Sequence, residues 1–386
     1  MDLFNTGTRR IPKESAENRQ GVIYVLGGSS IVFYLLLRFL PFADAEITRT
    51  QMLLASKMMS DALDIVRECR RDSGIAIEGD ADLHRTGLIG LEFSPLTTSR
   101  GDLQAKRTTT NPNMAALVVH VLNEANLGEG DLVAVGASGS FPALIIATHA
   151  AVKAMHLVPL PIYSIGASQW GANEPEFTWL DIERCLGTAG WLDAEPLSIS
   201  LGGENDIAED WSQEARSSVE LSIAAREGFF LHEPDLERNV KARMKLYEER
   251  AGERPIRAFI NIGGAWANLG ESAQILELEP GLNEITEIPT KEQRGVIFEM
   301  AARRIPVIHL LFIRGLCDRY GLPWDPTPLP APGEGDTYQR ARQQEPSFLA
   351  LSAAYLFSVF ILAFWARQSL SRSATDTNSN PKVSQR

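Results

Sequence analysis

Residues 130–155 read GDLVAVGASGSFPALIIATHAAVKAM, an apolar strand pattern, a glycine-rich turn and an apolar helix pattern in succession. A second apolar strand pattern, LVPLPIYSIG, follows at residues 157–166. It leads into the tripeptide GAS at 166–168, thirty residues after the GAS at 136–138 that ends the first strand. That spacing is typical of one strand–helix unit, so the stretch predicts parallel strands joined by a helix.

The same alternation continues on both sides of this unit. Two more strand patterns end in paired glycines, at residues 196–203 (PLSISLGG) and 258–264 (AFINIGG), with a charged, helix-rich stretch between them. Upstream, residues 88–93 (LIGLEF) predict a strand, and an amphipathic pattern predicts a long helix over residues 46–72. We therefore expect an α/β domain over residues 46–322, with a doubly wound, mostly parallel, Rossmann-like sheet.

Hydrophobic segments near both ends of the chain predict transmembrane helices. The first is free of charge from residue 21 to 37 and stays largely apolar to residue 40, and the second is free of charge over residues 347–365. About 20 apolar residues span a bilayer core, and buried core helices, the alternative, are rarely free of charge for so long. The proline-rich residues 323–346 are expected to form an extended linker outside the core.

Basic residues in the two tails predict the orientation of these spans. Residues 1–20 carry a net charge of +1 and residues 366–386 carry +3, which leaves −16 for the rest of the chain. Positively charged flanks stay in the cytoplasm, so we expect both tails to be cytoplasmic and the acidic central domain to be extracytoplasmic. A small-residue site at Ala45 leaves open the alternative that the first span is a cleaved signal peptide.

The three cysteines, Cys69, Cys185 and Cys317, permit at most one disulfide in an oxidising compartment, with one thiol left over. No CxxC or Cys/His spacing predicts a metal site. We interpret the three as buried, small apolar side chains and leave their disulfide status open.

The turn after the first strand contains a candidate catalytic residue, Ser138. Gly136, Ser138 and Ser140 form GxSxS between a strand and a helix, which is the context of a nucleophile elbow, although the elbow has glycine where this chain has Ser140. His232 or His309 could then act as the base. The alternative, which we favour, is a glycine-rich turn that packs tightly and binds an anion at the helix N-terminus.

A basic stretch within the polar loop 94–112 predicts a second ligand-binding element. Arg100, Lys106, Arg107 and Thr108 precede a helix expected to start at Pro112, with Asn111 as its cap. Cations and hydroxyls near a strand's carboxyl end suit a carboxylate or phosphate, and the alternative is a solvated loop. Further residues of strand-end turns are expected to line the same crevice; these are Ser168, Trp170, Gly263, Gly264 and Trp266.

Several motifs are absent from the sequence. It contains no GxxxxGK[ST], no HExxH and no GxGxxG, so it predicts neither a P-loop ATPase nor a bound cofactor or metal. An acidic domain without a basic face also argues against nucleic acid as a partner.

Four long strings carry a resemblance to a known family: LEFSPLTTSRGDLQAKRTTTNPN, VAVGASGSFPAL, IGASQWGANEPEFTW and INIGGAWANLG. Together with the two terminal spans, they make the chain resemble the poly-gamma-glutamate system protein family (PgsW-like) over nearly its whole length. The resemblance implies an accessory component of a membrane-associated system that makes and exports poly-γ-glutamate.

The partners that this resemblance implies are the membrane subunits of the synthase and export complex, and possible ligands are the anionic polymer or a small anion. Because the chain lacks the phosphate-binding loop of the amide ligase, it would act by binding or assembly. The resemblance supplies no catalytic residues. The alternative function is a membrane-anchored serine acyl hydrolase or transferase that uses Ser138.

Overall fold

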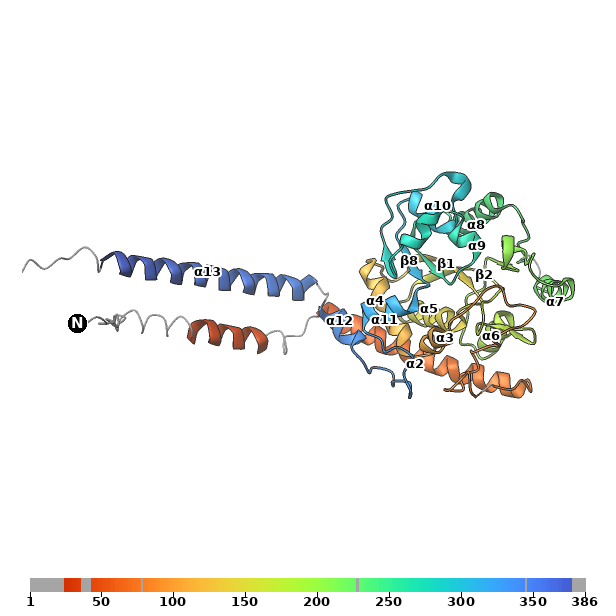
Figure 1. Cartoon of the computed structure of the whole chain (residues 1–386), viewed down its shortest axis with the longest axis horizontal. Coiled ribbons are helices and arrows are strands. Elements are labelled where there is room, and N and C mark those ends of the chain that lie inside the picture. Colours follow the sequence, from red (N-terminus) through yellow and green to blue (C-terminus); the bar gives the residue numbers. More distant parts are fainter. Residues whose placement is uncertain (1–23, 36–42, 78, 227–228, 344–345, 377–386) are drawn as a thin grey trace, which may run out of the picture. The chain divides into compact units, whose positions relative to one another are not determined.

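The computed structural model describes residues 24–35, 43–77, 79–226, 229–343 and 346–376. The chain divides into two compact units, one from Ile47 to Ala341 and one that combines Met1–Glu46 with Arg342–Arg386. All strands of the described residues lie in the first unit (Figure 1).

A six-stranded sheet with the order β5-β2-β1-β6-β8-β7 forms the centre of the Ile47–Ala341 unit. Its strands are β1 (Leu132–Ser138), β2 (Val158–Ser164), β5 (Ser198–Ser200), β6 (Ile256–Ile262), β7 (Gly281–Asn283) and β8 (Val307–Leu310). All neighbours pair in parallel except β7, which runs antiparallel to β8. The chain builds outward from β1 to β5 on one side and to β8 on the other, so the predicted mostly parallel α/β sheet is confirmed.

Helices cover both faces of this sheet (Figure 1). The apolar cluster on one face contains side chains from α2 (Ala43–Asp72), α4 (Asn113–Glu124), α5 (Pro142–Ala154), α6 (Trp179–Thr188), α7 (Gln213–Ala224) and α11 (Ile313–Tyr320). The other face packs on α8 (Leu236–Ala251) and α10 (Val296–Ala302). The short α9 (Trp266–Leu269) lies beside α8 and α10, and β3 (Asn173–Glu174) pairs with β4 (Phe177–Thr178) in a separate hairpin.

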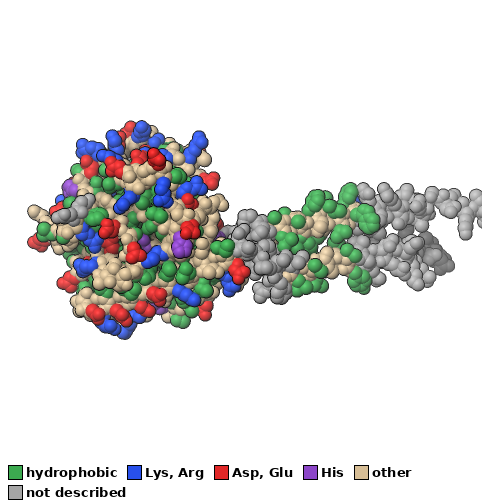
Figure 2. Space-filling view, turned by 180° about the vertical axis from the view of Figure 1, so that it is seen from behind, with side chains coloured by type: hydrophobic (Ala, Val, Ile, Leu, Met, Phe, Trp, Pro, Cys, Tyr) green, Lys and Arg blue, Asp and Glu red, His purple; other side chains and the backbone are tan. Residues whose placement is uncertain are grey.

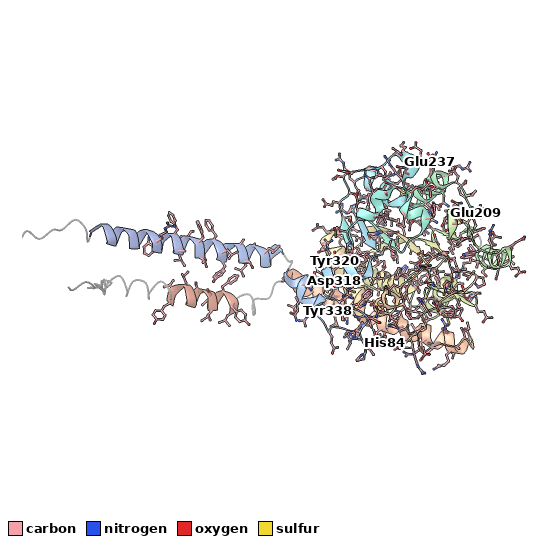
Figure 3. The ribbon with its side chains drawn as sticks, viewed as in Figure 1. His84, Glu209, Glu237, Asp318, Tyr320 and Tyr338 are labelled. Atoms are coloured by element: carbon pink, nitrogen blue, oxygen red, sulfur yellow. A yellow bond between two sulfur atoms is a disulfide. The ribbon has the colours of Figure 1, made fainter. Side chains whose placement is uncertain are left out.

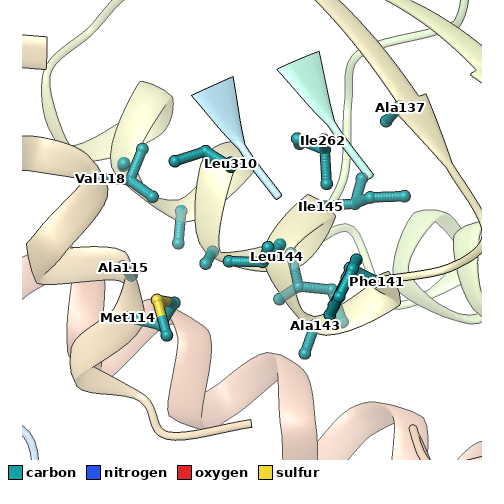
Figure 4. Close-up of a cluster of buried hydrophobic side chains, with 14 of the residues drawn as sticks. Met114, Ala115, Val118, Ala137, Phe141, Ala143, Leu144, Ile145, Ile262 and Leu310 are labelled. Carbon is teal, nitrogen blue, oxygen red and sulfur yellow. The ribbon is translucent and has the colours of Figure 1, made fainter. Parts of the chain in front are cut away.

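The core follows from the alternation of side chains along the strands. In β1, Val133 and Val135 join the larger apolar cluster, whereas Leu132 and Ala134 join the smaller cluster on the α8 face. Figure 4 shows part of the larger cluster, where Leu144 of α5 lies among apolar side chains from neighbouring helices and strands. Because both faces are buried, the central strands are mostly apolar, as in other parallel sheets, and Arg257 and Asn261 are the polar exceptions in β6.

Two local predictions upstream of the sheet are wrong. Residues 88–93 form no strand; their backbone bonds instead to a loop, since Gly90 N donates to Trp170 O and Trp170 N donates to Leu91 O. The polar loop contains an unexpected helix, α3 (Leu103–Thr109), whose first turn is capped by the Asp102 side chain. Short apolar runs do not distinguish a strand from a buried loop, and a seven-residue helix is too short to show a period.

The start of α4 differs slightly from its expected cap. The N-cap residue is Pro112, and Asn111 stabilises the turn by accepting a hydrogen bond from Asn113 N at 3.0 Å. The side chain of Asn113 in turn accepts a hydrogen bond from Tyr338 at 2.7 Å.

A disulfide joins Cys69 of α2 to Cys185 of α6, and Cys317 is a buried free thiol. The prediction of at most one disulfide, with one thiol left over, is therefore confirmed. The interpretation of all three cysteines as buried apolar side chains is wrong for Cys69 and Cys185, which are bonded to each other. The bond closes a sequence separation of 116 residues and fixes the long α2 to the helical layer.

The segment after α11 packs on the domain where an extended linker was predicted. The compact unit continues to Ala341, beyond the expected boundary at residue 322. Tyr338 of α12 (Thr337–Gln343) is buried and contacts the Ser56 hydroxyl at 2.8 Å (Figure 3). Prolines fix the path of this segment, and its side chains supply the contacts that keep it on the surface of the core.

The second unit contains a helical segment, 24–35, and the long α13 (Pro346–Asp376). Phe33 stacks on Tyr355 with ring centroids 4.0 Å apart, and the Ser30 hydroxyl bonds to the same tyrosine. Side chains of these helices are mostly apolar and exposed, while charged residues of both signs are interspersed over the visible face of the Ile47–Ala341 unit (Figure 2).

Within the described residues, no helix combines the length and hydropathy needed to cross a bilayer. The whole of the expected N-terminal tail and part of the first predicted span, together with the end of the C-terminal tail, lie outside those residues. The two spans and the cleavage at Ala45 therefore stay predictions.

Candidate functional site

A cavity of about 810 Å³ lies at the carboxyl ends of the parallel strands. Residues that end or follow β1, β2, β5, β6 and β8 line it, and so does the stretch that leads into α3. This is the edge at which open α/β sheets bind ligands, where the strand order diverges from β1. The polar and charged lining residues are Thr98, Ser99, Arg100, Asp102, Gln104, Lys106, Ser138, Ser140, Ser164, Ser168, Glu204, Asp210 and Arg314.

Three serines form a polar row below the cavity. Ser138 of β1 is in register with Ser164 of β2, which is in register with Ser200 of β5. Alternation along each strand directs all three toward the α8 face, where the preceding positions on β1 and β2 include the apolar Ala134 and Ile162. The sheet is therefore apolar through its middle and polar at the end that faces the cavity.

A buried ion pair fixes part of this row. Arg243 of α8 donates to Asp206 Oδ2 at 2.6 Å, and Asp206 Oδ1 accepts from Ser164 and Ser200 at 3.0 and 2.8 Å. Arg243 is fully buried and also donates to the Ser200 hydroxyl at 2.8 Å. The pair holds the ends of β2 and β5 against α8, so it organises the cavity floor from below.

Lys106 is the second buried cation at this edge, and no carboxylate of the described residues forms an ion pair with it. It lies on α3 with 2 % of its surface exposed, donates to the backbone oxygen of Ser140 and lies 2.7 Å from the Ser168 hydroxyl. Its ammonium also lies 3.6 Å from the centroid of the Phe141 ring. Burial lowers the pKa of Lys106 to about 7, and the nearby Asp102 carboxylate opposes this shift only in part.

Two strand-end turns are joined through their serines. Ser168 N donates to the Ser140 hydroxyl at 3.0 Å, so the turn after β2 is bonded to the turn after β1. Gly139 is required in this arrangement because a Cβ there would lie 2.4 Å from the backbone oxygen of Ile165. The repeated GAS sequence thus brings Ser140, Ser168 and Lys106 together.

Ser138 does not have the geometry of a nucleophile elbow. It is the last residue of β1 and the first residue of a turn in which Phe141 N bonds to Ser138 O at 3.5 Å, and it is 4 % exposed. Its hydroxyl is buried against Gly263, without a hydrogen-bond partner among the described residues. A base within hydrogen-bond reach is what activation of this serine requires.

Neither histidine proposed as that base contacts Ser138. His309 on β8 lies 3.2 Å from the Asn261 side chain, and burial lowers its pKa to about 4. His232 is exposed and its ring lies beside Phe230. The Ser138–His pair is therefore not formed in this structure.

The structure places seven of the predicted site residues in the cavity: Arg100, Lys106, Ser138, Ser140, Ser168, Gly264 and Trp266. Arg107 is directed elsewhere, since its guanidinium binds the Asp325 carboxylate, with Nε 2.8 Å from Oδ1. Thr108 donates to Gln104 O at 2.7 Å and accepts from Asp325 N at 2.9 Å, which is a structural role. The prediction of these two as ligand-binding residues is not supported by their contacts.

Three other predicted residues also lie outside the lining. Gly136 faces Asn268, Gly263 faces the Ser138 hydroxyl, and Trp170 is held in a left-handed conformation by loop hydrogen bonds. Trp266 does line the cavity, as predicted, and it is joined there by Trp324.

Sequence reasoning missed the lining residues after β5 and β8. Glu204, Asp210, Phe312, Arg314 and Trp324 all line the cavity. The signal for Phe312 and Arg314 was their position just after the apolar run of β8, which we did not predict as a strand. Trp324 could not be found, because its place depends on the packing of the proline-rich segment.

Comparison with known proteins supplies no identification: no family model, no curated protein and no solved structure matches this chain. Among the described residues, no group of three or more His, Cys, Asp or Glu side chains is arranged to hold a metal ion.

Proposed function

We propose that this chain is a membrane-anchored accessory component of poly-γ-glutamate synthesis or export, whose extracytoplasmic domain binds a carboxylate-bearing ligand. The observation that carries the binding proposal is the cavity at the strand ends, with the guanidinium groups of Arg100 and Arg314 in its lining. The assignment to the poly-γ-glutamate system rests on the resemblance of the long sequence strings.

Local charge in the cavity is compatible with an anionic ligand despite the overall charge of the domain. A region at −16 repels a polyanion over long range, so contact needs a local cationic site. Asp102 and Asp210 line the cavity but accept local hydrogen bonds, from Ala105 N and Glu204 N respectively. Arg100 is exposed, and its side chain makes no ion pair within the described part of the chain.

Aromatic walls favour a ligand with both an apolar stem and an anionic group. Trp266 and Phe312 line the cavity, and Arg314 lies over Trp324 with its guanidinium carbon 5.0 Å from the ring centroid. A carboxylate on a short aliphatic stem, as in a glutamyl residue, fits such a site because the stem contacts the rings and the anion contacts the cations.

The membrane part of the proposal rests on the terminal helices. Their exposed apolar side chains include Ile31, Val32, Phe357, Phe360 and Trp365. Exposed apolar side chains on helices with basic flanking sequences suit a bilayer.

Calorimetric titration of the full-length protein in detergent tests the binding proposal. We expect a γ-linked glutamate oligomer to bind and to raise the unfolding temperature, and its amidated, neutral counterpart to bind at least about tenfold more weakly. Arg100→Gln should weaken binding to the oligomer about tenfold, whereas Arg238→Gln, a change of an exposed arginine on α8, should not. Absence of binding by the wild type would contradict the proposal.

A pull-down from native membranes tests the assembly proposal separately. Recovery of an amide ligase and polymer-export subunits with the tagged chain would support it. Recovery of the chain alone under mild detergent would contradict it. The alternative of acyl chemistry at Ser138 is tested by the labelling experiment described below.

A further inference from the structure

The contact between Lys106 and Ser168 is suited to a chemical reaction, which goes beyond ligand binding. Lys106 Nζ and Ser168 Oγ are 2.7 Å apart, both side chains line the cavity, and they are 2 % and 7 % exposed as residues. A serine hydroxyl in hydrogen-bond contact with a buried amine is the arrangement of a nucleophile and its base. Ser138, in contrast, has an unpartnered hydroxyl and no base.

We propose that Ser168 is a nucleophile and Lys106 its general base, and that together they cleave an amide or ester bond in an acyl substrate that bears a carboxylate. This activity goes beyond ligand binding but uses the same cavity. The acyl group would lie near the joined turns of Ser140 and Ser168, and the carboxylate would lie toward Arg100 or Arg314.

The surroundings of Lys106 allow it to be a neutral amine near neutral pH. Its ammonium has no ion pair in the described chain and is enclosed by α3, the β1–α5 turn and the Phe141 ring. The pKa of Lys106 falls to about 7 through burial, whereas Asp102 at the start of α3 raises it. The other charged groups in the cavity lining are Arg100, Glu204, Asp210 and Arg314.

The hydrogen bonds of the neutral amine suit a base. It can keep donating to the Ser140 backbone oxygen and still offer its lone pair to the Ser168 hydroxyl. The Ser140 oxygen therefore fixes the direction of the lone pair, and Ser140 Oγ, which accepts from Ser168 N, fixes the backbone that carries the nucleophile.

The proposed reaction is balanced by these two residues and water. Lys106 Nζ takes the proton of Ser168 Oγ as that oxygen attacks the acyl carbon and the carbonyl electron pair moves to oxygen. When the pair returns, the bond to the leaving amine or alcohol breaks, and the leaving group takes the proton from Lys106. Water then attacks the Ser168 ester with Lys106 as base, which releases the carboxylic acid and restores the serine hydroxyl.

The start of α5 is placed to stabilise the negative oxygen that forms in this reaction. Ser140 and the N-cap residue Phe141 line the cavity, and no side chain caps the first turn of this 13-residue helix in the described structure. Pro142 at the first position has no N–H and Leu144 N already donates to Phe141 O at 3.0 Å, so the helix would stabilise this oxygen through the positive end of its dipole.

Labelling with a fluorophosphonate probe tests the proposal on the full-length protein in detergent. Attack of Ser168 on phosphorus displaces fluoride, and mass spectrometry of the digested wild type shows which residue carries the adduct. We expect the adduct on Ser168, and we expect the labelling rate to rise with pH through about 7 and then level off, as Lys106 becomes neutral. No labelling, or an adduct on Ser138 or elsewhere, would overturn the proposal.

Variants with a folded control separate the chemistry from structural effects. Ser168→Ala should abolish the adduct and Lys106→Met should slow labelling at least about 100-fold, and Ser222→Ala, on the surface of α7, should label normally. The position of the adduct in the wild type and the pH dependence of the labelling rate test the proposal even if a variant does not fold. Failure of labelling with intact binding of the γ-glutamate oligomer would reject this activity and leave the binding proposal in place.

Discussion

Arg243 and Lys106 are both buried cations at the carboxyl edge of the same sheet, yet their surroundings differ in kind. Arg243 has a carboxylate 2.6 Å away and further bonds to serine hydroxyls. Lys106 has a backbone oxygen, a hydroxyl and an aromatic ring, but no carboxylate in hydrogen-bond contact. Arg243 lies below the cavity, whereas Lys106 forms part of its lining.

The difference separates a structural cation from a reactive one. A guanidinium stays charged, so its burial requires a counter-charge, and removing either partner leaves the other charge buried. An amine can lose its proton, so its burial can instead be met by a lowered pKa. The Arg243 cluster therefore rigidifies the cavity floor, while Lys106 is held in a state suited to proton transfer.

The largest effect is expected from breaking the structural pair. Arg243→Met should lower the free energy of unfolding by about 3–5 kcal/mol, because the buried Asp206 carboxylate loses its counter-charge. Chemical denaturation of the variant and the wild type measures this change. Arg238→Met on the same helix is the matched control and should cost less than about 1 kcal/mol, since the Arg238–Glu233 pair is largely exposed. Equal losses in the free energy of unfolding would show that burial does not make the Arg243 pair more stabilising than the Arg238 pair.

The next effect is the contribution of Lys106 to the pH dependence of the free energy of unfolding. Its pKa is about 7 in the folded protein and 10.5 as the ordinary value, so the unfolded chain binds more protons between these two values. Stability from this group therefore rises with pH over that window. Between pH 7 and 9 the gain is about 2 kcal/mol, and it is absent in Lys106→Met.

The measurement is the difference in unfolding free energy between wild type and Lys106→Met at several pH values, which cancels the groups that both proteins share. A difference that does not change from pH 7 to 9 would show that Lys106 keeps its charge in the folded state. Arg243→Met, compared with wild type in the same way, should show no such rise, because a guanidinium stays charged.

A smaller loss of stability is expected at Arg107, whose ion pair is intermediate in exposure between the Arg243 pair and the Arg238 pair. Its side chain is 13 % exposed and pairs with Asp325, 11 % exposed, which holds the pKa of Arg107 above its ordinary value. Arg107→Met should lower the free energy of unfolding by about 1–2 kcal/mol, between the costs of a buried and an exposed pair. Chemical denaturation checks the value, and a loss as large as that of Arg243→Met would contradict the ranking.

Arg107→Met also tests the segment that was predicted to be a free linker. Asp325 is tied to the core through Arg107 and Thr108, so the change should loosen this segment first. Faster hydrogen exchange confined to residues near Asp325 would agree with this, and unchanged exchange there would not.

The sequence by itself determined four strands of the sheet, β1, β2, β5 and β6, and the glycine-rich nature of their turns. Mostly apolar strands end in glycine turns, two of them thirty residues apart, and this pattern predicts parallel strands with helices between them. The same pattern placed Ser138, Ser140 and Ser168 at one edge, because the carboxyl ends of parallel strands meet there. The limit of one disulfide also followed from the count of three cysteines.

Only the tertiary structure decided which side chains of that edge act together. Lys106 and Arg107 are adjacent in sequence, but the turn of α3 directs one to Ser168 and the other to Asp325. Asp325 and Trp324 belong to a segment whose prolines predict extension, and its docking depends on contacts about two hundred residues away in the sequence. Local pattern determines backbone elements because hydrogen bonding and alternation are local, whereas the burial that lowers the pKa of Lys106 comes from several distant elements packing around it.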